Sequence, residues 1–273
     1  LGRSGLFVAP QVSYERTSVD LFVDDAPRSR YRRLTRRGAI DLGVTNGRHF
    51  EARAGYEVAD VQADVTVGDP LLPAVDGIQR AWRVGATFDG QDGPVLPRRG
   101  LRLVGELRRF IKTAPARADA EGIVLKDPDR LLQGRVDAGY FHPVGQTGRA
   151  FVSGAYHTSF GNTAIINAFT LGGPFRLGAF RADALRGSNV AVISTGYFHE
   201  LARIFEGAFG SVHLGGWVEN GAIFERRGTA RVETNFSGGV VVDTPLGPGF
   251  LTASVGEGGR FRFYVGIGPL FPR

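Results

Sequence analysis

The sequence predicts an all-β fold in which antiparallel strands form a barrel that spans a membrane. Segment after segment alternates bulky apolar residues with small or charged residues, the period of two that marks a strand between two different environments. No hydrophobic interior is left over for a second layer, so we expect lipid to cover the apolar face. Short and long connections alternate along the chain, as they do at the two rims of such a barrel.

The last stretch of the chain, residues 260–271, shows the alternation most clearly. Its apolar face carries Phe261, Phe263, Val265, Ile267 and Phe271. The other face carries arginine, tyrosine and glycine. Bulky apolar groups on one side only are typical of a strand between oil and water, so we expect this stretch to be the terminal strand of the barrel wall.

About twelve such strands can be counted, each of roughly ten residues or more, which is the length that a tilted strand needs to cross a bilayer. The first runs from about Leu6 to Val23 and contains Pro10, where we expect the hydrogen-bond ladder to be broken. The next returns from about Arg28. The strands expected after the longest loop occupy residues 190–204, 210–221, 232–244, 249–257 and 260–271.

The connections are short at residues 45–47 and 144–146 and long at residues 113–129 and 161–188. Outer-membrane barrels have short periplasmic turns and long extracellular loops, so the short turns predict the periplasmic rim. Aromatic girdles lie near the strand ends in such barrels. The tyrosines near expected strand ends are Tyr14, Tyr56, Tyr140, Tyr156 and Tyr197.

The composition excludes several classes of protein. The 273 residues include 40 Gly and 20 Phe but no Cys, which excludes disulfide scaffolds, thiolate metal sites and cysteine nucleophiles. No stretch approaches the ~18 consecutive apolar residues of a transmembrane helix. The net charge is +6, yet outside residues 28–37 the arginines are spread singly over alternate positions, so no nucleic-acid partner is predicted. Because the chain has no Met, we expect an N-terminal region to precede Leu1.

The sequence predicts no catalytic site, no cofactor and no metal site in this segment, which is therefore not expected to be an enzyme by itself. A patatin-type hydrolase needs a Gly-x-Ser-x-Gly elbow and an Asp, and no such pentapeptide occurs. The five histidines lie on different expected strands, without the local spacing of metal ligands. Glu51 and Glu57 could form an acid/base pair, but Arg53 between them indicates a neutralised barrel wall.

Three segments, residues 88–100, 171–187 and 243–258, resemble the barrel of the bacterial surface-antigen superfamily, which includes BamA-like assembly factors and two-partner secretion transporters. The chain looks most like the C-terminal barrel domain of patatin-like phospholipases, and the resemblance covers nearly its full length. It implies a barrel of about 16 strands. Residues 1–273 would then be the C-terminal part of one outer-membrane barrel domain, with roughly four N-terminal strands and a passenger domain lying upstream.

The resemblance also implies that the long loop folds back into the lumen as a lid. The hallmark of that loop is an aliphatic residue, an arginine, a glycine and an aromatic residue. The aligned residues are Leu177, Gly178, Ala179 and Phe180. The arginine is therefore missing, so either the anchor of the loop is weakened, or Arg181 or Arg186, just before Gly187, supplies the guanidinium from a neighbouring position.

The partner of the loop in that family is an inward carboxylate on the second strand after the loop. Residues 217–221 (W-V-E-N-G) resemble this motif, with Glu219 in the acidic place and Gly221 at its end. The alternation of the strand puts Glu219 on the lumen face. We expect a charge-assisted contact of Glu219 with Arg181 or Arg186 to hold the loop. The alternative is that Glu219 is one of many hydrated lumen charges.

The leading hypothesis is a bacterial outer-membrane barrel that anchors, and helps to export, an N-terminal passenger resembling a patatin-like phospholipase. Its expected partners are membrane lipid, that passenger, and the barrel-insertion machinery. In the family this machinery reads a terminal strand ending in an aromatic, although here Pro272 and Arg273 follow Phe271. A second hypothesis is a BamA-like assembly or two-partner secretion pore with periplasmic modules upstream. A barrel enzyme or passive pore is the third.

Overall fold

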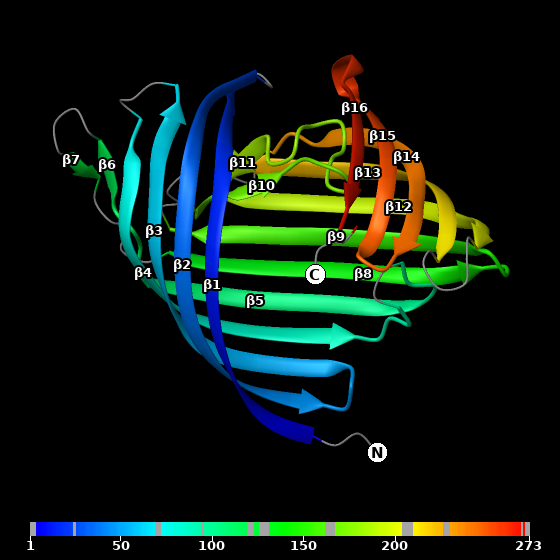
Figure 1. The fold of residues 1–273 in the computed structure, drawn as a ribbon, viewed down its shortest axis with the longest axis horizontal. Helices are drawn as coiled ribbons and strands as arrows, with labels where there is room; N and C mark the ends of the chain where they lie inside the picture. Colours follow the sequence, from blue (N-terminus) through cyan, green and yellow to red (C-terminus); the bar gives the residue numbers. More distant parts are fainter. Residues whose placement is uncertain are drawn as a thin grey trace. The chain divides into compact units, whose positions relative to one another are not determined.

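The computed structural model describes residues 4–23, 26–68, 72–93, 96–118, 123–125, 131–161, 167–203, 210–225, 230–268 and 270. These residues form strands β1 Ser4–Val23, β2 Ala26–Asn46, β3 Phe50–Val67, β4 Ala74–Asp89, β5 Gly100–Lys112, β6 Ala116–Ala118, β7 Ile123–Leu125, β8 Leu132–Val144, β9 Gly148–Phe160, β10 Phe169–Leu171, β11 Leu185–Gly187, β12 Asn189–Arg203, β13 Ser211–Phe224, β14 Glu233–Thr244, β15 Gly247–Gly256 and β16 Phe261–Ile267 (Figure 1). The 3₁₀ turn η3, Glu257–Gly259, lies between the last two strands.

The strands follow one another in the sheet almost in chain order. The path is β1-β2-β3-β4-β5-β8-β9-β12-β13-β14-β15-β16, with β6 paired to β4 and β7, which makes 14 strands in one sheet of the described residues. The pairs are antiparallel where their register is known. The all-β antiparallel fold is thus confirmed, and the path contains the expected number of long strands. Among the described residues, no helix has the length and apolar character to cross a membrane.

The contacts divide the chain into two compact units. Unit 1 comprises residues 1–87, 105–135 and 157–169, and unit 2 comprises residues 88–104, 136–156 and 170–273. The expected long loops are not wholly irregular, since the first contains β6 and β7 and the second contains the two-stranded sheet β10-β11.

The first hairpin corrects the expectation for Pro10. The register of β1 on β2 runs without a shift through Pro10, which lies opposite Ile40, and the only irregularity of this pair falls between Leu21 and Phe22. A proline is tolerated in an antiparallel ladder because only alternate residues direct their N–H groups at a given neighbour. The expected break at Pro10 is therefore wrong.

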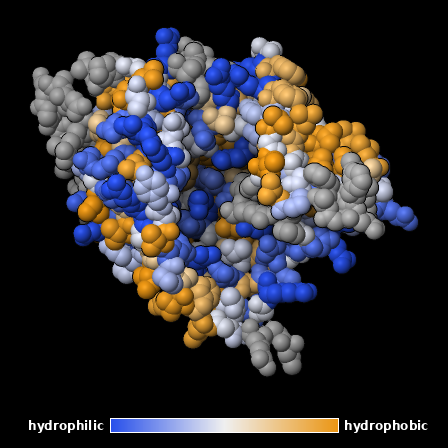
Figure 2. Space-filling view, in the orientation of Figure 1, coloured by the Kyte–Doolittle hydropathy of each residue, from blue (hydrophilic) through white to orange (hydrophobic). Residues whose placement is uncertain are grey.

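One face of the strands, here called the outer face, exposes its apolar side chains. Leu6 is 89% exposed, Val12 is 92% exposed and Val265 is 77% exposed. Orange hydrophobic side chains cover β14, β15 and β16 in Figure 2. Monomeric soluble proteins rarely expose apolar patches of this extent. The two-face parity expected from the sequence is confirmed.

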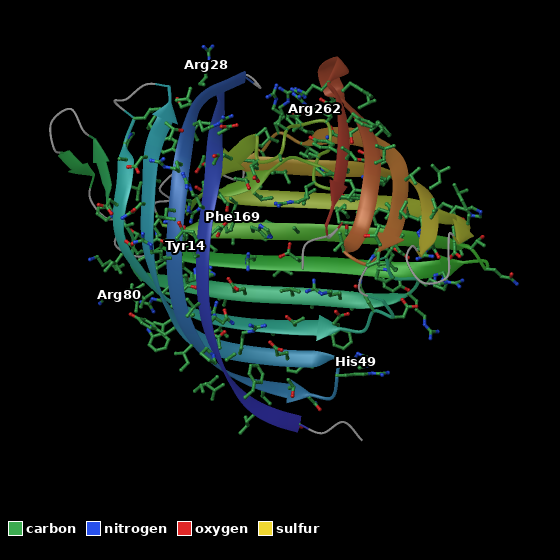
Figure 3. The ribbon with its side chains drawn as sticks, viewed as in Figure 1. Tyr14, Arg28, His49, Arg80, Phe169 and Arg262 are labelled. Atoms are coloured by element: carbon green, nitrogen blue, oxygen red, sulfur yellow. The ribbon has the colours of Figure 1, made fainter. Side chains whose placement is uncertain are left out.

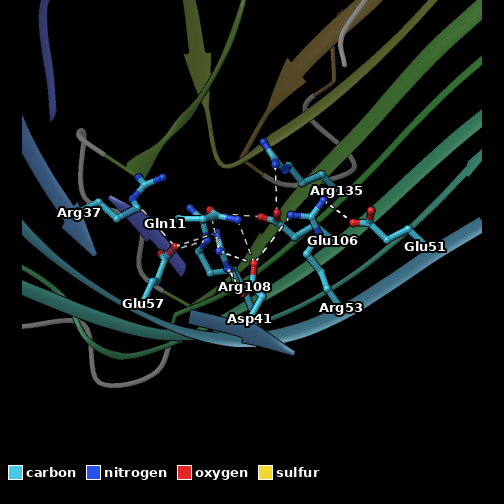
Figure 4. A network of polar contacts seen from close by, with 10 residues as sticks. Gln11, Arg37, Asp41, Glu51, Arg53, Glu57, Glu106, Arg108 and Arg135 are labelled. Atoms are coloured by element: carbon cyan, nitrogen blue, oxygen red, sulfur yellow. Dashed lines mark hydrogen bonds and ion pairs between the residues drawn. The ribbon is translucent and has the colours of Figure 1, made fainter. Parts of the chain in front are cut away.

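The opposite face, the inner face, carries a network of charged side chains in unit 1 (Figure 4). Asp41 on β2 is fully buried and accepts hydrogen bonds from Arg83 on β4, at 2.8 Å from Nε and 2.6 Å from the terminal nitrogen. Gln11 on β1 donates to Asp41 at 3.2 Å and accepts from Arg83 at 2.9 Å. Gly55 leaves the space for this carboxylate, since a Cβ there would lie 1.8 Å from Asp41 Oδ1. One buried carboxylate thus ties three strands together.

The network continues across β3, β5 and β8 through alternating charges. The further ion pairs are Arg108–Glu57 at 3.3 Å, Arg108–Glu106 at 3.3 Å, Arg135–Glu106 at 3.3 Å and Arg53–Glu51 at 2.6 Å. The neutralised wall expected around Arg53 is therefore present in unit 1.

The inner face of unit 2 contains a buried hydrophobic cluster, which corrects the expectation that no apolar interior is left over. A buried cluster consists of Leu96, Phe141, Phe151, Phe175, Phe198, Trp217, Val241 and Leu270, with Phe250 packed against it. Two inserted segments cause the difference, because the turn after β4 contributes Leu96 and the long loop contributes Phe175. Together they cover aromatic side chains of the strands that water would otherwise reach.

Two arginines hold the turn between β4 and β5 in this position. Arg149 on β9 donates to the carbonyl of Leu96 at 2.7 Å, and Arg98 donates to the carbonyl of Gln146 at 2.6 Å. Inside the turn, Asp92 accepts from the backbone N–H of Arg98 at 2.9 Å. Hydrogen bonds therefore fix the conformation of this turn and its position in unit 2.

We predict that Asp41→Asn destabilises the protein by about 3 kcal/mol, because it leaves the buried Arg83 guanidinium without its counter-charge. Urea unfolding of the protein in detergent, followed by heat-modifiable gel migration, measures the change. Asp20→Asn is the matched control, since Asp20 pairs with the exposed Arg30 at 2.6 Å, and its midpoint should stay unchanged. Equal losses in both variants would contradict the role assigned to Asp41.

Candidate functional site

The candidate site is the part of the long loop that lies on the inner face of unit 2, residues 170–187. Its ends are joined in the β10-β11 sheet. Between them the backbone turns back on itself, with Gly172 N–H donating to the carbonyl of Arg176 at 2.9 Å and Phe180 N–H donating to that of Leu177 at 3.0 Å. Arg176, which the sequence analysis did not single out, donates to the carbonyl of Thr170 at 2.8 Å. The loop therefore has a defined internal structure.

Three non-glycine residues of the loop adopt the left-handed conformation. Phe175 has φ 62°, Leu177 has φ 65° and Asp183 has φ 57°. Such a conformation is uncommon for a non-glycine residue and unfavourable for a bulky one. The contacts that the loop makes with the strands must outweigh this cost.

The central contact is between the backbone of the loop and a buried carboxylate. Gly178 N–H donates to Glu219 Oε2 on β13 at 2.7 Å, and Glu219 is fully buried. The same oxygen accepts a hydrogen bond from the Ser237 hydroxyl on β14 at 3.0 Å, and Ser237 and Ser254 on β15 lie 2.7 Å apart, oxygen to oxygen. Hydrogen bonds to a carboxylate are among the stronger ones in proteins, so this contact holds the loop to three strands.

Close packing makes glycine necessary around this contact. A Cβ on Gly178 would lie 2.2 Å from Ser254 Oγ, and a Cβ on Gly256 would lie 2.7 Å from the Cβ of Ala179. Gly221, part of the motif expected from the sequence, faces the side chain of the fully buried Leu177, 3.1 Å from where its Cβ would be. The motif residues Leu177, Gly178, Ala179 and Gly221 are thus brought together.

Aromatic contacts add to the anchor on either side. Phe175 stacks on Trp217 of β13, with ring centroids 4.4 Å apart and planes 13° apart, and meets the edge of Phe250. On the other side, the Tyr264 hydroxyl of β16 donates to the carbonyl of Phe180, and the Arg260 guanidinium lies 4.5 Å from the Phe180 ring centroid. Such stacked and cation–π contacts each contribute about 0.5–1.5 kcal/mol.

The two loop arginines proposed to contact Glu219 lie differently. Arg181 is exposed, and Arg186 on β11 is half-buried. Burial lowers the pKa of the Arg186 guanidinium, while the charge of Asp183 acts in the opposite direction. Gly187 is buried beside Ile223, which leaves no room for a side chain there. The described hydrogen bonds of Glu219 come from Gly178 and Ser237, and the guanidinium contact stays a prediction.

The expected terminal strand is present as β16. Its outer face exposes the expected apolar residues Phe261, Phe263, Val265 and Ile267. Phe271 lies outside the described residues. The reading of this strand by an insertion machinery stays a prediction. In the described part of the chain, no group of three or more His, Asp or Glu side chains is arranged to hold a metal ion.

The sequence analysis missed three parts of the site: the backbone donor Gly178, the Phe175–Trp217 stack and the hydroxyls on β14 and β15. The small residues Ser237, Ser254 and Gly256 at neighbouring inner positions of β14 and β15 are a signal that something approaches closely. Backbone donors and pairings between a loop and a strand depend on the tertiary fold and leave no periodic pattern.

Comparison with known proteins shows the fold. No family model and no curated protein matches the sequence. The structure of BamA from Haemophilus ducreyi lacking POTRA domains 1–3 matches with a TM-score of 0.69 and 10% identity, over 95% of this chain and 58% of that one. CdiB from Escherichia coli matches with a TM-score of 0.60 and 12% identity, over 96% of this chain and 49% of that one. The fold is that of a BamA-type barrel, and this chain spans about half the length of the two relatives.

We predict that Gly178→Ala releases the loop, because the added Cβ would lie 2.2 Å from Ser254 Oγ. Loss of a hydrogen bond to a charged group costs about 1.5–3 kcal/mol, so cleavage by thermolysin within residues 170–187 should accelerate at least about tenfold. Mass spectrometry of the digest measures it. Gly93→Ala, where a Cβ meets nothing within 4 Å, should leave the rate unchanged. An unchanged rate in Gly178→Ala would remove the steric argument.

Glu219→Ala should also expose the loop to thermolysin, since the Gly178 N–H and the Ser237 hydroxyl would lose their buried acceptor. The same assay tests the guanidinium contact. If a guanidinium also holds Glu219, either Arg181→Gln or Arg186→Gln must accelerate cleavage to a similar degree. Protection equal to that of the unaltered protein in both arginine variants would eliminate that contact and leave the backbone anchor alone.

Proposed function

We propose that this chain is the membrane-embedded part of a bacterial outer-membrane protein and that it anchors an N-terminal passenger of the patatin-like phospholipase type. The observation that carries the location is the exposed apolar outer face, which runs along the strands in both units. In hydrocarbon, all backbone groups must be paired within the structure. A sheet whose strands pair with their chain neighbours meets this requirement for the strands between its two edge strands, β1 and β16.

The filled inner face of unit 2 favours an anchor over a passive pore. The loop and the turn after β4 cover the strands there with a dry aromatic cluster, and the loop is fastened by the Gly178–Glu219 hydrogen bond. A water-filled channel needs a polar lining instead. The patatin-like nature of the passenger rests on the sequence resemblance alone.

Assembly or secretion of other proteins is the second candidate function. The fold similarity to BamA and to CdiB favours it. Under this proposal the region upstream of the chain carries small α/β modules, and the insertion machinery and outer-membrane lipid are partners under both proposals. The charged, ion-paired inner face of unit 1 is compatible with either function.

Fractionation of cells and analysis of the upstream sequence test these proposals together. We expect the full-length protein in the outer-membrane fraction of a density gradient, with heat-modifiable migration on gels, and a Gly-x-Ser-x-Gly serine hydrolase encoded upstream. Repeated α/β modules upstream would replace the first proposal with the second. Recovery of the protein from the inner membrane or the cytosol would contradict both.

A further inference from the structure

A row of outward arginines lies where the apolar part of the outer face ends in unit 1. On β1, the outer positions change from Val12 and Tyr14 to Arg16, and on β2 they change from Ile40 and Gly38 to Arg36. Beyond this level the outer face of β2 and β3 is largely polar, while Ile78 on β4 and Ile111 on β5 are exposed just beyond the arginines of those strands. The polar residues there include Arg30, Arg32, Gln62 and Asp64. Figure 2 shows the change along β1, from orange near its beginning to blue along its upper part.

The inner face changes in the opposite sense at the same level. Beyond the ion-pair network, inner positions of β2, β3 and β4, together with Ala114 after β5, form a small hydrophobic core against which Val19 and Leu21 of β1 pack. Its buried members are Tyr31, Ala59, Val61, Ala63, Val75 and Ala114. A sheet that is polar outside and apolar inside is typical of water-exposed structure. The two reversals together mark the level at which the strands leave lipid.

The positions of the arginines agree with the length of one membrane crossing. Counted from the strand end at the short-turn side, Arg36 lies 10 residues from Asn46, Arg80 lies 9 from Asp89, Arg109 lies 9 from Gly100 and Arg16 lies 12 from Ser4 (46 − 36, 89 − 80, 109 − 100 and 16 − 4). A tilted strand crosses the hydrocarbon in about 9–11 residues. The arginines therefore lie at the far boundary, which is the extracellular one if the short turns are periplasmic.

These side chains point outward and are available to a ligand. All four arginines are exposed, and Figure 3 shows Arg80 on the outer side of β4. Arg36 pairs with Asp60 at 3.3 Å. In the described part of the chain, no ion pair occupies Arg16, Arg80 or Arg109. The four guanidinium groups outnumber the one carboxylate that pairs with them, Asp60, so the row carries a net positive charge.

We propose that this arginine row, Arg16, Arg36, Arg80 and Arg109, binds the phosphate groups of lipopolysaccharide in the outer leaflet. The inference rests on the proposed outer-membrane location. The phosphates of this glycolipid lie between its acyl chains and its sugars, at the level where the row lies. A guanidinium matches a phosphate with two parallel hydrogen bonds. Trp82, the next outer residue after Arg80, is 56% exposed and places an indole ring at the same interface.

Trp82 also provides the measurement. The chain contains two tryptophans, and Trp217 is buried in unit 2. Full-length protein purified from outer membranes in detergent is titrated with rough lipopolysaccharide, with the same glycolipid after enzymatic removal of its phosphates, and with phosphatidylglycerol. Tryptophan emission reports binding, and the same titration of a Trp82→Phe variant separates the signal of Trp82 from that of any tryptophans upstream of the chain. We expect the phosphorylated glycolipid to bind at least about tenfold more tightly than either of the others.

Substitution of the row should remove this preference. Each single Arg→Gln change should weaken binding by about two- to fivefold, and the four together by at least about tenfold, while Arg→Lys changes should restore part of the affinity because they keep the charge. Arg48→Gln in the short turn at the opposite rim is the matched control and should change nothing.

Three results would overturn the proposal: equal binding of phosphatidylglycerol, unchanged affinity in the fourfold variant, or an equal loss in Arg48→Gln. Heat-modifiable gel migration confirms that each variant is folded. If the unaltered protein does not fractionate with the outer membrane, the proposed function fails and the assigned glycolipid partner fails with it. If the protein fractionates with the outer membrane but binds the phosphorylated and dephosphorylated glycolipids equally well, the proposed function stands and the phosphate-binding role of the arginine row is refuted.

Discussion

The alternation of side chains between two faces is the constraint on which the rest of this structure depends. A slip of one residue in the pairing of β1 with β2 would turn Asp41 outward and Leu42 inward, and every other side chain of the strand would change faces with them. The buried Asp41–Arg83 pair and its bonds to Gln11 resist such a slip, because they exist in one register only. The ion pairs of the inner face therefore specify the position of the strands as well as neutralising charge.

The inner faces of the two units are lined by different kinds of side chain. Unit 1 keeps charged residues there and pairs Asp41, Glu51, Glu57 and Glu106 with arginines, which is favourable only where the geometry is good. Unit 2 carries a cluster of aromatic side chains beside its buried polar groups, and the long loop and the turn after β4 cover this cluster. Glu219, the buried carboxylate that anchors the loop in unit 2, accepts its hydrogen bonds from a backbone N–H and a hydroxyl.

The strands could be predicted from the sequence because apolar and polar residues alternate with a period of two in any strand that has one apolar face and one polar face. The outer face, the terminal strand β16 and the boundaries of β12 to β15 follow from that period. The dry cluster around Trp217 and Phe198 could not be predicted, because its cover comes from segments distant in sequence. Pro10 was misjudged for a related reason, since whether the N–H group that a proline lacks would have been needed in the ladder depends on which neighbour the strand pairs with.

The loop is held to Glu219 by its backbone at the position where the resemblance implies an arginine side chain. In the resemblance, position 178 aligns with an arginine, yet the structure puts a glycine there whose own N–H reaches Glu219 at 2.7 Å. The backbone can come this close because no Cβ stands between it and Ser254. A side-chain anchor reaches its partner from a distance and costs rotamer entropy, whereas a backbone donor loses none. The carboxylate therefore has a partner at the position where the resemblance implies an arginine, and the contact is one that only glycine at position 178 allows.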